Sequence, residues 1–161
     1  MKTEALENFV GNLGEHALFK GLAPQYLTLL AQVAMAKQFA ADEVIFREGD
    51  PANRFYLILE GEVALESPAT DHGSVVLQTI GPDDVLGWSW LFPPYYWHFG
   101  ARATKPTKAI FFYGTWLRDS CERDHEFGYE MMKRMAAIII KRLQSARKRL
   151  AQLDASTTVS G

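Results

Sequence analysis

The spacing of apolar residues changes twice along the chain and divides it into three parts. Residues 4–36 carry apolar side chains at helical spacing, with Leu6 and Leu13 in a first helix and Pro24 at the first turn of a second. From residue 37 short apolar segments alternate with turns, and after residue 114 helical spacing returns. The pattern predicts a helical segment over 1–36, a β-roll over 37–114, helices over 115–153 and a disordered tail over 154–161.

The middle part has the rhythm of an all-β unit. Turn sequences rich in glycine and proline recur about every ten to twelve residues between residues 48 and 106. The apolar segments between these turns are 44–46, 55–59, 63–65, 75–77 and 109–113. Short strands at such spacing are typical of a closed roll. The predicted fold class is therefore α+β: a β-roll, or double-stranded jelly-roll-like barrel, with N-terminal helices and a long C-terminal helix.

Aromatic residues are concentrated in residues 84–103, which hold three of the four tryptophans. The end of this stretch alternates, so that Trp97 and Phe99 share one face of a strand while His98 and Arg102 share the other, which we expect to face solvent. So many aromatic side chains must pack together or against a ligand, because exposing them would create a large apolar patch. Residues 84–103 are therefore predicted to line a ligand pocket or to fill one.

The predicted helix over 126–153, which Asp124 can cap, carries a narrow apolar seam. Its members alternate in steps of four and three: Met132, Ala136, Ile139, Leu143, Ala146, Leu150 and Leu153. This spacing is typical of a two-stranded parallel coiled coil, and it predicts a homodimer. The alternative is a single helix packed on its own domain. The first half of the helix also fits that alternative, because Met131, Met135 and Ile138 widen the apolar stripe.

Composition narrows the choice of partners. The net charge of −2 gives no general attraction to nucleic acid or to anionic membranes, and no apolar run is long enough to span a bilayer. Basic residues gather in the last predicted helix, where they occupy the faces beside the seam. The single cysteine excludes an internal disulfide and suits a reducing compartment. We therefore expect a cytoplasmic protein with no membrane contact and no specific DNA binding by this chain alone.

A metal-dependent enzyme of the cupin type is the alternative from another class. Such enzymes need several histidine and carboxylate ligands that converge inside the barrel. The four histidines, His16, His72, His98 and His125, stand alone, without a His-x-His pair. The sequence therefore predicts no metal site, no catalytic residue and no enzyme.

Several segments together resemble the cyclic-nucleotide-binding domain family, in particular the effector domains of catabolite-activator and fumarate-nitrate-regulator type transcription factors. The segments are 18–22, 43–50, 56–63 and 137–150, and the resemblance covers about residues 15–153. It implies a regulatory or sensory domain in which a ligand in the roll shifts the dimer helix, so that a partner protein, not identified by the sequence, reads the altered surface. It leaves open an alternative: the ligand-binding part of a catabolite-activator type transcriptional regulator.

The chain departs from this family in the phosphate-binding cassette. The family pattern Gly-Glu-x-x-Leu, followed by Arg-(Ser/Thr/Ala)-Ala, aligns with residues 87–91 and 97–99. Trp88 stands where the family glutamate binds the ribose, and Trp97 stands where the family arginine pairs with the cyclic phosphate. Arg142 matches a family arginine, and Ala146 replaces a base-reading threonine. Without the bidentate arginine, we expect no cyclic AMP binding of the usual kind.

Two interpretations of the aromatic cassette remain. In the first, Trp88, Tyr95, Tyr96 and Trp97 fill the nucleotide pocket, and the domain serves dimerisation or docking. In the second, they form a flat-walled site that stacks a planar or cationic ligand other than a cyclic nucleotide. The first needs fewer assumptions. The sequence establishes no cofactor and leaves a nucleotide or another planar small molecule as the candidate ligand. The residues of the pocket or its filling are Leu86, Gly87, Trp88, Ser89, Tyr95, Tyr96, Trp97, His98, Phe99 and Arg142.

Overall fold

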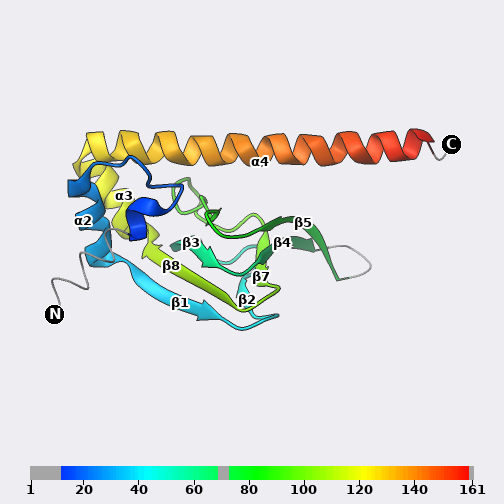
Figure 1. Cartoon of the computed structure of the whole chain (residues 1–161), viewed down its shortest axis with the longest axis horizontal. Coiled ribbons are helices and arrows are strands. Elements are labelled where there is room, and N and C mark those ends of the chain that lie inside the picture. The colour runs from blue at the N-terminus through cyan, green and yellow to red at the C-terminus, as the bar shows by residue number, and fades with distance from the viewer. Residues whose placement is uncertain (1–11, 69–72, 160–161) are drawn as a thin grey trace.

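A computed structural model describes residues 12–68 and 73–159 of the chain (Figure 1). Most of the first predicted helix, including Leu6, lies outside the described residues, and so does the predicted turn at His72. Residues 12–15 are helical, in agreement with the end of that helix.

Two four-stranded antiparallel sheets form the roll (Figure 1). One sheet has the order β1-β8-β3-β6, with bounds Met35–Phe39, Thr107–Tyr113, Arg54–Glu60 and Val85–Leu86. The other has the order β2-β7-β4-β5, with bounds Val44–Phe46, Gly100–Ala103, Val63–Pro68 and Ser74–Ile80. The predicted fold class, a β-roll with flanking helices, is confirmed.

All five predicted apolar segments are strands, but the sequence assigned the start of β1 to a helix. The preceding helix, α2, ends at Val33, and Ala34 has extended dihedral angles. Met35 then pairs with Phe111 of β8. Only Phe39 of the five β1 residues is buried, so β1 lacks the alternation that reveals a half-buried strand.

The helices whose full bounds lie in the described residues are α2 (Pro24–Val33), α3 (Gly114–Arg123) and α4 (His125–Val159), and they flank the roll. The predicted cap of α4 is confirmed, because Asp124 Oδ1 accepts the N–H groups of Glu126 and Phe127 at 3.1 and 3.2 Å. Helix α3 begins directly after Tyr113 and has no side-chain cap.

The long helix α4 lies across the roll and extends beyond it (Figure 1). It continues to Val159, where the sequence predicted a disordered tail from residue 154. The sequence offers no glycine or proline between Asp154 and Val159, so nothing there interrupts the helix. No helix in the described part of the chain is long and apolar enough to cross a membrane.

Side chains pack into two clusters on opposite faces of β3. Phe55 and Leu57 point to a helical cluster that contains Trp90, whereas Tyr56 and Ile58 point into the roll. Trp88 is half-buried and packs against both clusters. The cassette therefore connects the interior of the roll to the helices around it.

Candidate functional site

The cassette begins with a close approach between Gly87 and Trp97. Leu86 pairs with Tyr56 in the sheet and is completely buried, and the chain then turns at Gly87 with a φ of +96°. A Cβ atom at this position would overlap the Trp97 ring. Glycine is therefore needed for the backbone conformation and for the space that Trp97 occupies.

Trp97 lies inside the roll, where its side chain is only 3% exposed. Its ring stacks on Phe46, with 3.8 Å between ring centroids and 7° between planes, and Phe99 lies beside it. Its backbone N–H donates to the carbonyl of Asp50 at 2.9 Å, and its carbonyl accepts from Gly49 at 2.8 Å. Stacking and backbone hydrogen bonds together hold the indole in the interior of the roll.

Trp88 lies between the roll and α4. Its ring centroid is 6.0 Å from that of Phe99, and the Arg142 guanidinium lies 4.8 Å from the Trp88 centroid. Nη2 of Arg142 donates to the carbonyl of Val85. Burial lowers the pKa of Arg142 to about 10, against an opposing effect of Asp84, so the group remains charged at neutral pH.

Two buried polar groups of the candidate site have no hydrogen-bond partner among the residues that the structure describes. One is the Ser89 hydroxyl, and the other is Nη1 of Arg142. Buried polar atoms are nearly always paired in folded proteins. These two atoms therefore mark places where the packing of this chain alone is incomplete.

Tyr95, Tyr96 and His98 lie apart from the group around Trp97. Tyr95 has a φ of +61° and places its ring 4.0 Å from the Arg118 guanidinium. Tyr96 is 49% exposed, and His98 is also exposed. Trp97 and Phe99 are thus buried inside the roll, and Trp88 is half-buried against the same cluster. The first interpretation placed Tyr95 and Tyr96 inside the nucleotide pocket. That part needs correction, because the Tyr95 ring packs against Arg118 and Tyr96 is exposed at an isolated bridge to Pro51.

The sequence did not identify Phe46 and Arg118 as members of this site. Phe46 was assigned to a strand, but its stacking on Trp97 joins segments that are far apart in the chain. Arg118 lies in a predicted helix, and only the fold brings it to Tyr95. Local patterns carry no signal for either contact.

Arg102 is the Arg or Lys residue within residues 84–103. It lies outside the roll, as strand alternation predicts, and pairs with Glu66 at 2.7 Å and Asp42 at 3.0 Å. Its charge is therefore compensated by these two carboxylates, away from Trp97.

The predicted dimer seam lies on the outer side of α4. Met132, Leu143, Leu150 and Leu153 are 44–67% exposed, Ala136 and Ala146 are exposed, and Ile139 is half-buried. Met131 and Met135, on the other side of α4, are buried against the helical cluster. The first half of α4 thus presents one apolar face to its own domain and another to the outside.

Metal ligands do not converge within residues 12–68 and 73–159, where no group of three His, Cys, Asp or Glu side chains could hold an ion. His16 is buried, whereas His98 and His125 are exposed on other parts of the surface.

The family model, the relatives in sequence and the solved structures that this chain resembles all point to the same kind of domain. Residues 36–124 match the family model for the cyclic nucleotide-binding domain. A CRP-like cAMP-activated global transcriptional regulator of Mycobacterium tuberculosis is 29% identical over 82 residues, which are 51% of this chain and 37% of that protein. A cAMP-dependent protein kinase regulatory subunit of Dictyostelium discoideum is 41% identical over 61 residues, which are 36% of this chain and 19% of that protein.

A solved structure covers more of the chain. It is that of a candidate cyclic nucleotide-binding protein from Geobacter metallireducens, 31% identical, with a TM-score of 0.75. The match covers 83% of this chain and 96% of that one.

Proposed function

The chain belongs to the cyclic nucleotide-binding domain family, and on this premise we propose that it is a dimeric regulatory or sensory domain whose cassette does not bind cyclic nucleotides in the usual way. The observation that carries the proposal is the position of Trp97. An aromatic ring stacked on Phe46 fills the space beside Gly87 inside the roll.

A cyclic phosphate at this cassette would lack its charged partner. Charge-assisted, bidentate pairing with arginine is the strongest contact available to a phosphate, and desolvating the phosphate without it is costly. Arg142 already stacks on Trp88 and donates to Val85, and Arg102 pairs with carboxylates outside the roll. Neither guanidinium is placed beside Trp97.

The relatives support a regulatory role but do not identify the output. By their names, the M. tuberculosis protein is activated by cAMP and the D. discoideum protein regulates a kinase. This chain spans 37% and 19% of their lengths, so the activities of the whole proteins do not transfer to it. We propose a cytoplasmic domain that acts through a partner protein.

A titration of the purified chain with cyclic AMP and cyclic GMP tests the cassette. Trp88, Trp90 and Trp97 all lie in it, so occupancy would change tryptophan emission. We expect no saturable change up to millimolar concentrations, and calorimetry in parallel controls for binding without an optical signal. Saturable binding at micromolar concentration would show that backbone donors and stacking replace the arginine, and it would refute the proposal.

The exposed seam of α4 supports the proposed homodimer. Leu143 and Leu150 are 58% and 67% exposed and lie one heptad apart. Sedimentation equilibrium should give twice the mass of one chain, and Leu143→Glu with Leu150→Glu should give a monomer. Gln144→Glu is the matched control, because Gln144 is exposed beside the seam. A monomeric parent chain, or a double variant that remains dimeric, would refute the coiled-coil pairing.

A second candidate function is the ligand-binding part of a catabolite-activator type transcriptional regulator, which the M. tuberculosis match favours. The basic residues beside the seam do not form a base-reading element, so we expect at most weak, salt-sensitive DNA binding by this chain. A mobility shift that prefers one sequence over random DNA would contradict that expectation.

A further inference from the structure

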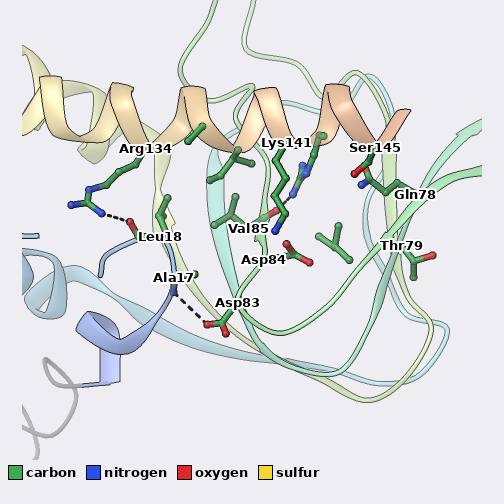
Figure 2. A pocket seen from close by; sticks show the side chains of 14 residues that line it. Ala17, Leu18, Gln78, Thr79, Asp83, Asp84, Val85, Arg134, Lys141 and Ser145 are labelled. Atoms are coloured by element: carbon green, nitrogen blue, oxygen red, sulfur yellow. Dashed lines mark hydrogen bonds between the residues drawn. The ribbon is translucent and has the colours of Figure 1, made fainter. Parts of the chain in front are cut away.

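A cavity of about 420 Å³ lies between α4 and the turn that joins β5 to β6 (Figure 2). Its walls come from α4, from residues 78–80 of β5, from residues 83–85 and from Ala17 and Leu18. Trp88, Ser89 and Trp97 do not line it. The cavity is thus separate from the cassette interior. Arg142 lines the cavity and also contacts Trp88 of the cassette.

Arg142 at the wall of this cavity is a buried cation that forms no ion pair with any residue that the structure describes. The residue is 9% exposed, and Nη1 has no hydrogen-bond partner in the described part of the chain. Its remaining contacts are a carbonyl oxygen and an aromatic face, which satisfy the guanidinium only in part. A charge buried in this way is strongly unfavourable unless an anion compensates it.

The acidic residues of the cavity are engaged elsewhere. Asp84 Oδ2 accepts the backbone N–H of Gly81 at 2.9 Å, and Asp83 Oδ1 accepts that of Ala17 at 3.3 Å. Neither carboxylate lies within ion-pair distance of Arg142 or of Lys141. Figure 2 shows Lys141 reaching from α4 toward the loop that carries Asp84, so a second cation faces the cavity.

The third cation, Arg134, is already used. It donates to the carbonyl oxygens of Leu18 and Lys20 at 2.7 and 3.0 Å and pairs with Glu130 at 3.5 Å. Arg142 and Lys141 therefore remain as the positive groups that can meet a ligand.

The remaining walls combine apolar and neutral polar side chains. Leu18, Ile80, Val85 and Ile138 supply apolar surface, and Gln78, Thr79 and Ser145 supply neutral hydrogen-bonding groups. A ligand that matches this lining has an anionic head and an apolar body. Asp83 and Asp84 disfavour a second negative charge, which selects a carboxylate over a phosphate dianion.

We propose that this cavity binds a small amphipathic monocarboxylate, with its carboxylate between Arg142 and Lys141 and its apolar body against Ile80 and Ile138. A small rotation of the Arg142 side chain brings Nη1 to the ligand. The same rotation loosens the contact of the guanidinium with Trp88, so binding at this site changes the emission of that tryptophan. Of the residues predicted to line or fill the cassette, only Arg142 also lines this cavity.

Calorimetric titration with hexanoate, acetate, hexyl phosphate and inorganic phosphate tests the proposal on the full chain. Hexanoate should bind at one site per chain, at least tenfold more tightly than acetate and more tightly than hexyl phosphate. Arg142→Gln should weaken the affinity for hexanoate at least tenfold. Arg147→Gln is the same change at an exposed position of α4 outside this cavity, and it should change the affinity for hexanoate less than twofold.

Two further variants keep the test decisive if Arg142→Gln does not fold. Ala137→Phe, at an exposed position of α4 that lines the cavity, should abolish hexanoate binding while preserving the circular dichroism spectrum. Trp88→Phe should remove most of the emission change while calorimetric binding persists. Absence of saturable hexanoate binding, equal affinity for acetate, tighter binding of hexyl phosphate, or no effect of Arg142→Gln and Ala137→Phe would each overturn the proposal.

Discussion

At the scale of single residues, the interior of the roll is an aromatic core built around Trp97. Gly87 leaves room for the indole, and Phe46 stacks on it. These three residues therefore form one packing unit, and a change in any of them should be felt by the other two.

A methyl group at Gly87 should reveal this unit. Gly87→Ala meets both an unfavourable positive φ and the Trp97 ring, so the free energy of unfolding should fall by about 2 to 5 kcal/mol. Gly73→Ala is the matched control, because Gly73 has a φ of +78° and no atom within 4 Å of the added carbon. It should lose only about 1 to 2 kcal/mol. Urea denaturation measures both, and equal losses would contradict the role of the Trp97 contact.

The residue-level prediction from the sequence was accurate where it rested on alternation. Trp97 and Phe99 point inward and His98 and Arg102 outward, as a two-residue period requires. The destinations of Tyr95 and Tyr96 could not be predicted, because the positive φ of Tyr95 and its contact with Arg118 depend on the assembled fold. The burial of the Arg142 side chain also depends on the assembled fold and could not be predicted from the sequence.

At the scale of elements, α4 is the feature that organises the molecule. Its start is fixed by Asp124, whose carboxylate accepts two backbone N–H groups of the first turn. Its first half closes the helical cluster through Phe127, Met131 and Met135. Its outer side presents the apolar seam that we propose for dimerisation.

Removing the cap should weaken the whole domain, because the start of α4 packs against the helical cluster. Asp124→Ala should lower the free energy of unfolding by about 1 kcal/mol, within the usual range for a lost N-cap. Asp124→Asn should retain most of the stability, because an amide oxygen also accepts these hydrogen bonds. Denaturant unfolding of the parent chain and the two variants measures the effect. An equal loss of unfolding free energy in both variants would show that the charge of Asp124, and not its hydrogen bonds, stabilises the helix.

The elements that the sequence predicted best are those with strong local signals. Five strands were found because they are apolar and bounded by turns, and Asp124 was found because it precedes a clear helical period. The strand β1 was missed because four of its five residues are exposed. The extension of α4 through residues 154–159 was missed because small polar residues are common both in tails and in helix ends.

At the scale of the whole molecule, His16 links the N-terminal segment to the loop beside the roll. Its Nδ1 accepts the N–H of Leu18 at 3.2 Å, and the backbone of Ile58 and Asp84 lies close to the imidazole. Burial lowers the pKa of His16, although Asp83 and Asp84 oppose the shift. The folded chain therefore binds a proton at this site more weakly than the unfolded chain does.

Stability should accordingly depend on pH through His16. A lowered pKa of a base stabilises the fold above the unfolded pKa, about 6.5, and this contribution is lost as the pH falls below it. Between pH 7 and pH 5 the free energy of unfolding should fall more for the parent chain than for His16→Gln. His98→Gln, at an exposed position, should follow the parent. Parallel pH profiles for the parent and His16→Gln would contradict this assignment.

The division of the interior into two clusters has an optical consequence. Trp90 and Trp116 report on the helical cluster, Trp97 on the interior of the roll, and Trp88 on both. Replacing either Trp90 or Trp97 by phenylalanine therefore shifts the fluorescence signal toward the other cluster. Unfolding curves that coincide for the two variants, after correction for their midpoints, would show that the roll and its helices melt as one unit. Separate curves would show two cooperative units, one around each tryptophan, although only six residues separate Trp90 from Trp97 in the chain.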